Sequence, residues 1–476
     1  MDDGVRRYTF HPLERRGLLL GLDAAQIATL IGGLVAAVAV GHVLAGPAGV
    51  GSAACVLAGS AAGALWPAGG RPLITWARPG AAWLVRRGRG PVLSMTPLEG
   101  RGPTAPPVHR GLAPAGLDLV ELDPAPGEPA VGVLRDRRSG TWAAVLPVRG
   151  RAFSLLDPDQ QVQRLEAWRA VLASVARPGS PIKRVQWVAR SAPGGVPGPG
   201  DRPRVPEAAD AAAERAQHSY AELVSALAAD TRTQDVWIVV SVEGSRGRPG
   251  TNHRPADALR RELRLLQGQL RHADLVPEDP LGPVGLEHSV AALHRPRGRT
   301  AGSGRNNPAW PLASEEAWSW YRTDESWHAT FWIAEWPRVE VTPDFLTPLL
   351  VGGGRRTVSV IMAPVPSSRA LREVRSARTA DVADARLRDR AGFLPSARRE
   401  REAEGVARRE SELTEGHAEF RFSGYVTISA PDRAELDVLC AEAEHAAQTA
   451  HLELRRLHGR QAEAFTWTLP LARGLA

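Results

Sequence analysis

The chain has 476 residues, which is room for two or three domains of ordinary size and excludes a peptide or a lone small module. It carries 59 lysine and arginine residues against 52 aspartate and glutamate residues, a formal net charge of +7, and Lys183 is the one lysine. Its two cysteines, Cys55 and Cys440, exclude a disulfide framework and a cysteine metal site and are consistent with a reducing compartment.

Two apolar runs, residues 24–45 and 48–66, follow one another near the start of the chain and are joined by a glycine and proline turn. Each is long enough to cross the hydrocarbon layer of a membrane as a helix, and neither contains a charged residue. We therefore predict a membrane hairpin in preference to two helices buried in a soluble core. A cleavable signal peptide fits poorly, because its apolar region is shorter and a polar mature chain follows it.

Basic residues flank the two runs, and the turn between them has none. They are Arg6, Arg7, Arg15 and Arg16 before the first run and Arg71, Arg78, Arg86, Arg87 and Arg89 after the second. By the positive-inside rule, both termini are expected in the cytoplasm, so the chain is predicted to pass twice through the inner (plasma) membrane. The same arginines can meet anionic lipid, which makes membrane lipid an expected partner.

Small residues recur at every fourth position on both predicted membrane helices. The two sets are Gly33, Ala37 and Gly41, and Cys55, Gly59 and Gly63. Such faces let helix backbones approach closely. We expect the two helices to pack on each other or on another membrane subunit.

Residues 1–90 are thus predicted to form the anchor, 91–116 a linker and 117–294 a first α+β domain. The stretch 72–116 is rich in Pro, Gly and Arg and is expected to hold no long regular element. Strands are predicted at 131–134, 142–148, 152–156, 182–188 and 236–240, and helices from 158 to the stop at Pro178 and at 207–230, 256–273 and 285–293. Alternating helices and apolar strands imply a sheet covered on at least one face.

Residues 295–476 are predicted to form a second α+β domain, which opens with a tryptophan-dense region. Alternation with polar residues there predicts strands with one buried face. A short helix is predicted at 343–350 and a further strand at 357–362. A cluster of aromatic side chains could stack on bases or bind sugar, but this pattern favours core or interface. The candidate partner surface consists of Trp318, Trp320, Trp332 and Trp336.

A charged helical arm is predicted at 366–414, from two helical stretches at 369–389 and 397–414. Charges of both signs favour a solvated face and only secondarily a partner surface. A strand at 420–428, a helix at 432–449 and a strand at 452–457 then suit a ferredoxin-like sandwich. The predicted fold is a membrane α-hairpin followed by α+β cytoplasmic domains, with ferredoxin-like split β-α-β sheets.

No motif for catalysis, cofactor binding or metal binding is recognisable. A phosphate-binding P-loop needs a lysine after its glycines, and Lys183 does not stand in that pattern. The glycines at 352–354 fit a flexible turn. His445, His451 and His458 lack the spacing of a zinc helix. We therefore expect a chain that is not an enzyme and that carries neither cofactor nor metal.

Two regions carry a resemblance to known families. The opening residues 8–17 with the hairpin resemble the small PrgI-like membrane subunit of Gram-positive conjugation systems. The remainder is similar to the amino-terminal domain of VirB/TrbE-type conjugation ATPases. The similar motifs lie at 332–337, 378–381, 422–426 and 461–465, together with Leu469 and Pro470. In that family the closing motif precedes the motor domain, whereas this chain stops at Ala476.

The resemblance implies a non-catalytic subunit of a conjugative or type IV secretion-like apparatus for DNA or protein transfer. Its expected partners are a separate transfer ATPase and channel membrane proteins. Two alternatives stay open. Direct nucleic-acid binding by the arginine-rich cytoplasmic part predicts an affinity that falls steeply with salt, and a membrane-tethered enzyme with an unrecognised site predicts a pocket with perturbed titratable residues.

Overall fold

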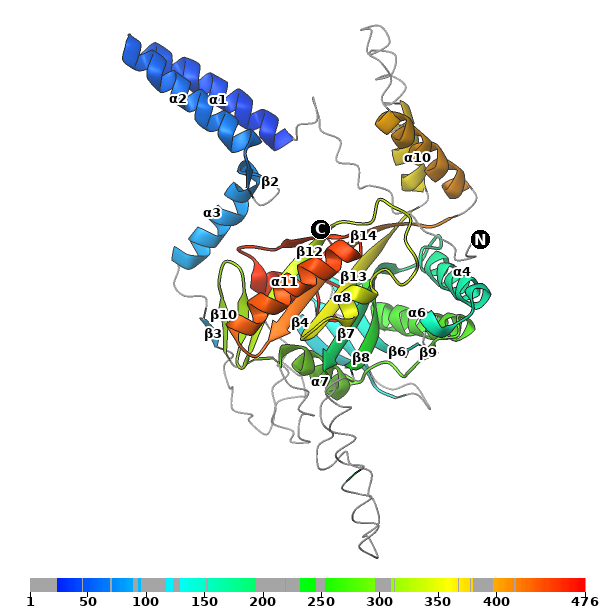
Figure 1. The fold of residues 1–476 in the computed structure, drawn as a ribbon. Coiled ribbons are helices and arrows are strands. Elements are labelled where there is room, and N and C mark those ends of the chain that lie inside the picture. The colour runs from blue at the N-terminus through cyan, green and yellow to red at the C-terminus, as the bar shows by residue number, and fades with distance from the viewer. Residues whose placement is uncertain are drawn as a thin grey trace, which may run out of the picture.

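The computed structural model describes residues 24–44, 46–68, 71–88, 93–95, 117–122, 129–150, 153–193, 219, 232–244, 253–295, 310–311, 313–366, 368–376, 378–379, 397–414 and 417–475. In this range the chain forms a helical hairpin, a folded body and a helical arm (Figure 1). The opening segment 8–17, most of the expected linker 91–116 and the expected helix 207–230 apart from Ser219 lie outside the described residues.

The two apolar runs form helices α1 (Ala24–Val43) and α2 (Pro47–Leu65), each long and apolar enough to span a membrane, as predicted. Gly46 permits the turn between them, because its φ of 94° lies where L side chains are strained. Pro47 starts α2, a position where its missing N–H is not needed. Only 11% of the apolar window of each helix is buried, so the hairpin stays outside the folded body.

A third helix connects the hairpin to the body. Strands β1 (Pro67–Ala68) and β2 (Arg71–Pro72) pair with each other, and α3 (Ile74–Gly88) follows. The expectation of no long regular element in 72–116 is therefore wrong for this part. Pro79 inside α3 removes a backbone hydrogen bond, but the tryptophans of α3 pack on the body, and this tertiary contact outweighs the local preference.

The body is built on one antiparallel sheet, which has 13 strands in the described part of the chain. The strands are β3 (Leu93–Met95), β4 (Leu117–Leu122), β5 (Val131–Asp136), β6 (Thr141–Arg149), β7 (Ile182–Pro193), β8 (Arg232–Glu243), β9 (Val276–Pro277), β10 (Ala313–Glu316), β11 (Tyr321–Thr323), β12 (Ser326–Glu335), β13 (Arg355–Val365), β14 (Glu419–Ala430) and β15 (Glu453–Arg456). They lie in the order β3-β10-β11-β12-β14-β13-β7-β8-β6-β5-β4, with β15 beside β12 and β9 beside β6. Since β13 pairs with β7, the sheet runs unbroken across the boundary expected at residue 295.

Two halves of this sheet have the same order of elements. The helices involved are α4 (Pro158–Val175), α6 (His253–His272), α8 (Thr347–Val351) and α11 (Arg433–Thr449). The first half runs β6-α4-β7-β8-α6-β9 and the second β12-α8-β13-β14-α11-β15. In space the strand order is β9-β6-β8-β7 in one and β15-β12-β14-β13 in the other, so the second strands of the two halves pair in the middle.

Helices and a C-terminal segment cover the two faces of the sheet. On one face, Leu263 of α6 packs on Val240, and Leu436 of α11 packs with the apolar residues of β12 to β14. On the other face lie α7 (Pro283–His294), α12 (Gln461–Thr466) and the chain that follows α12. There Phe465 belongs to the cluster that contains Val188 and Val239. Both faces are therefore buried in the middle of the sheet.

Three predicted elements differ from the structure. The strand expected at 152–156 is a 3₁₀ turn (Phe153–Leu155), and Leu155, which was expected to lie in that strand, is 84% exposed. The helix expected at 343–350 begins only at Thr347, after turns closed by hydrogen bonds to Thr342 and Asp344. The tryptophan-dense β12 was expected to bury one face, but α11 and α12 cover both.

The connection from β13 to β14 forms the predicted arm. Residues 368–376 are helical, and α10 (Ala397–Thr414) leads back toward the sheet. Val365, Val374 and Leu413 belong to a small apolar cluster at its base, and Arg378 pairs with Glu410 at 2.6 Å. Residues 380–396 lie outside the described range.

Candidate functional site at the junction of α3 and the body

The small residues of α1 lie against α2. A Cβ at Gly33 would come within 2.2 Å of Ser60 Oγ, and a Cβ at Gly41 would lie 3.7 Å from Ala53 Cβ. Ala37, between them on the same stripe, is 2% exposed. The absence of larger side chains at these positions therefore lets the two helix backbones approach closely.

Of the small residues of α2, the predicted positions Gly59 and Gly63 do not face α1, whereas Ala53 and Ser60 do. No described atom lies within 4 Å of a Cβ built at Gly59 or Gly63. The outer surface of the hairpin is apolar, and its exposed large side chains on α1 include Ile31, Leu34, Val35 and Val38. This surface has the composition that a hydrocarbon environment requires.

The predicted flanking arginines fall into three groups. Arg6, Arg7, Arg15, Arg16 and Arg89 lie outside the described residues, Arg71 lies in β2 and Arg78 in α3. Arg86 and Arg87 stand in the last turn of α3. The Arg86 guanidinium donates to the carbonyl of Gly459, and the Arg87 guanidinium lies 5.0 Å from the centre of the Trp83 ring. Arg86 therefore ties α3 to the body.

Trp318 is the centre of the junction between α3 and the body. Its ring lies 6.2 Å from that of Trp76 and 5.3 Å from that of Trp83, both on α3, and it stacks on His458 at 5.8 Å. Gly459 has a φ of 74°, and a Cβ there would lie 2.6 Å from the Trp318 ring, so both backbone and packing require glycine. Each aromatic pair contributes about 0.5–1.5 kcal/mol beyond the area it buries.

A cavity of about 460 Å³ adjoins this junction, between the end of α3, residues 315–320 and Arg433 of α11. On its wall, Glu316 accepts a hydrogen bond from the Ala462 backbone N–H at 3.1 Å. Burial raises the pKa of Glu316, and the Ala462 N–H and the charge of Arg86 oppose that rise. The described lining contains neither histidine nor cysteine, so it pairs no nucleophile with an imidazole base.

The other three tryptophans of the candidate partner surface make contacts within the body. Trp320 lies against Trp327 with ring centres 4.5 Å apart and also lines the junction cavity. Trp332 donates from Nε1 to Ser423 Oγ at 3.0 Å. Trp336 packs edge-on against Phe422 at 5.2 Å. The structure thus brings Trp318 and Trp320 to the junction. It places Trp332 on β12 and Trp336 directly after β12, and both contact residues of β14.

A buried glutamine on β7 fastens the C-terminal segment. Gln186 is fully buried, and its Nε2 donates to the carbonyls of Trp467 at 3.1 Å and Leu469 at 2.9 Å. Its Oε1 accepts from the Ala472 N–H at 2.7 Å. Gln186, a polar residue inside the strand predicted at 182–188, was the signal for this contact, which sequence reasoning did not use.

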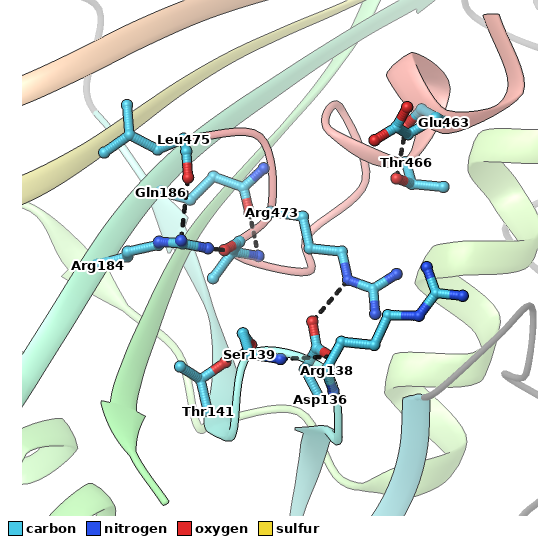
Figure 2. A network of polar contacts seen from close by, with 11 residues as sticks. Asp136, Arg138, Ser139, Thr141, Arg184, Gln186, Glu463, Thr466, Arg473 and Leu475 are labelled. Atoms are coloured by element: carbon cyan, nitrogen blue, oxygen red, sulfur yellow. Dashed lines mark hydrogen bonds and ion pairs between the residues drawn. The ribbon is translucent and has the colours of Figure 1, made fainter. Parts of the chain in front are cut away.

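Charged groups hold the end of the same segment (Figure 2). Arg473 donates to Asp136 at 2.9 Å, and Arg184 donates to the carbonyls of Ala472 and Leu475. Burial alone would raise the pKa of Asp136, but Arg473 and the backbone N–H groups of the following turn outweigh it and hold that pKa below its ordinary value. The C-terminal segment therefore ties β7 to the end of β5.

Two histidines are buried on the same face of the sheet. His328 contacts Thr323 through Nε2 and Ser429 through Nδ1, both at 2.8 Å. His294 lies between the rings of Trp310 and Phe465. Burial lowers the pKa of His294 to about 4 and that of His328 well below its ordinary value. Both rings are therefore neutral at pH 7.

The described residues contain no cluster of metal ligands. No group of three His, Cys, Asp or Glu side chains among them is placed to hold a metal ion. Burial raises the pKa of the Cys440 thiol to about 11, which leaves it protonated and a poor nucleophile at neutral pH.

No protein-family model matches this chain, and a comparison with curated proteins finds no similar sequence.

Proposed function

We propose that this chain is a membrane-anchored, non-catalytic subunit of a conjugative or type IV secretion-like transfer apparatus. It holds a separate transfer ATPase at the inner face of the membrane. The observation that carries the proposal is the apolar hairpin, which stays outside the body yet continues through α3 into the junction at Trp318. A helix pair that exposes its apolar side chains to solvent has an unfavourable free energy, which insertion into lipid removes.

The charge distribution supports a two-pass topology with both termini in the cytoplasm. The turn at 46–49 is uncharged, and the arginines stand at the other end of both helices. The body then lies in the cytoplasm, at the distance from the membrane that α3 sets.

Each half of the sheet supports a ferredoxin-like interpretation. The order of elements in both halves is β-α-β-β-α-β, which is the order of that fold. Two of the motifs that carry the resemblance to the conjugation ATPases, 332–337 and 422–426, also pack together in the second half. Trp332 donates to Ser423, and a Cβ at Gly424 would lie 2.7 Å from both Ile333 and Trp336.

Purification of the tagged chain from detergent-extracted membranes tests this proposal. The expected result is that a second chain with a P-loop motif co-purifies with the tagged chain. ATP hydrolysis activity should be found in the membrane fraction only when the tagged chain is present. The control is a variant with Val38→Arg and Leu57→Arg in the hairpin, which should release both chains into the soluble fraction. Recovery of the intact chain without any ATPase or channel protein would count against the proposal.

A further inference from the structure

Two arginines lie side by side on the face of the sheet that the C-terminal segment covers. Arg355 is the first residue of β13, and Arg190 lies on β7 directly opposite Thr357. Arg355 and Thr357 share a face because alternate residues of a strand do. The two arginines are therefore diagonal neighbours, about 7–8 Å apart at the backbone, within reach of long side chains.

Their guanidinium groups are buried and incompletely paired. Arg355 is 3% exposed and Arg190 is 7% exposed. Arg190 Nη1 donates to Asp235 at 3.1 Å, but Arg190 Nε, Arg355 Nε and Arg355 Nη1 have no hydrogen-bond partner among the described residues. Within the described part of the chain, these three buried nitrogen donors thus lack an acceptor.

The groups nearest to Arg355 are already engaged with each other. Ser429 lies opposite Arg355 on β14 and contacts His328, whose other nitrogen contacts Thr323. His328 is neutral at pH 7, so it contributes no charge. Two guanidinium charges and the Asp235 carboxylate leave one net positive charge. The Asp235 side chain is 44% exposed, so the cluster reaches solvent at the β8 side.

A buried, unpaired guanidinium is unfavourable, because it has lost its hydration without gaining an acceptor. Burial lowers the pKa of Arg355 to about 9, with a further contribution from the charge of Arg190, yet the group stays protonated at pH 7. An oxyanion would accept hydrogen bonds from the three nitrogens and neutralise the remaining charge.

We propose that Arg190 and Arg355 form a binding site for a tetrahedral oxyanion, either inorganic phosphate or the phosphate group of a phosphomonoester. The site joins β7 to β13, and an anion there would link the two halves of the sheet. This inference is independent of the proposed transfer function, since it concerns the interior of the body.

The test is thermal unfolding of the full-length chain in detergent as phosphate replaces chloride at constant ionic strength. The midpoint is expected to rise with phosphate by about 2 °C or more, because a ligand that binds the folded state stabilises it. A parallel series with glycerol phosphate distinguishes the sources: an equal rise assigns the site to phosphomonoesters, and a rise with phosphate alone assigns it to the free anion. The proposal is overturned if the midpoint rises in neither series.

Arg355→Gln should abolish the rise and leave the midpoint without phosphate equal to or above that of the parent chain. The matched control is Arg356→Gln. Arg356 is also buried, but its guanidinium is bound by carbonyls at the end of α8 on the opposite face. This variant should have a lower midpoint and keep the rise. Equilibrium dialysis with labelled phosphate at 25 °C gives a readout that does not depend on stability, and equal binding by Arg355→Gln and the parent chain would overturn the assignment.

Discussion

At the scale of single residues, a few polar side chains hold the C-terminal segment on the sheet. Gln186 satisfies two backbone carbonyls and one backbone N–H of that segment. Gln186→Ala leaves these buried groups unpaired, and an unsatisfied buried group costs about 1–3 kcal/mol. We expect the free energy of unfolding to fall by about 3 kcal/mol or more, as measured by urea unfolding followed by tryptophan fluorescence. Gln163→Ala, at an exposed position on α4, is the control and should have little effect.

The pKa of His294 predicts how stability depends on pH. The ring is neutral in the fold down to about pH 4, whereas the unfolded chain takes up a proton below about pH 6.5. The unfolded state thus binds more protons between these values, and stability falls as the pH falls through that window, by up to about 3 kcal/mol. The groups that act on His294 are the Val290 carbonyl and Asp324, which raise its pKa, and Arg295, which lowers it.

His294→Phe retains an aromatic ring beside Trp310 and Phe465 and removes the titration. The loss of stability between pH 6.5 and pH 4 should become smaller than in the parent chain, as measured by thermal unfolding across this range. His445→Phe, at an exposed position on α11, should follow the parent. Equal losses in His294→Phe and in the parent chain would show that His294 does not control this dependence.

At the scale of helices and strands, the packing of α1 on α2 depends on Gly33. A leucine there would overlap Ser60, and overpacking of this kind costs about 1–3 kcal/mol. The measurement uses a background variant in which Cys55→Ala and Cys440→Ala remove the native thiols. Gly41→Cys and Ala53→Cys are then added, because the Cβ separation of 3.7 Å between these positions suits a disulfide. Gly33→Leu should reduce the yield of this disulfide by about half or more. Gly59→Leu, which meets no described atom, should leave it unchanged.

The packing of α3 on the body depends on Trp318. Trp318→Ala removes its ring contacts with Trp76, Trp83 and His458. The free energy of local opening of α3 should fall by about 1.4 kcal/mol or more. This corresponds to a tenfold rise in the rate of amide hydrogen exchange along α3. Trp66→Ala, at a site that is 65% exposed, is the control. Unchanged exchange in Trp318→Ala would show that α3 is held by other contacts.

Local sequence patterns predicted most of the elements. α1, α2, α4, α6, α7 and α11 lie close to their predicted positions, because apolar spacing and end signals such as Pro158 act over a few residues. α3 was missed because its stability depends on Trp318, which is far away in the sequence. The junction and the arginine pair were missed for the same reason, since each unites residues that only the sheet brings together.

At the scale of the whole molecule, one sheet connects what were expected to be two domains. Pairing of β7 with β13 brings together residues on both sides of position 295. Local composition cannot reveal this, because the pairing joins strands that lie far apart in the sequence. The matching spatial orders β9-β6-β8-β7 and β15-β12-β14-β13 likewise depend on pairing between distant segments.

The central claim is that the apolar hairpin fixes the body to the membrane, and carbonate extraction of isolated vesicles tests it most directly. The full-length chain should stay in the pellet after the wash. The variant with Val38→Arg and Leu57→Arg places two charges in the hydrocarbon layer, at about 2.5–3.5 kcal/mol each, and should move to the supernatant. Release of the full-length chain by carbonate would contradict the claim.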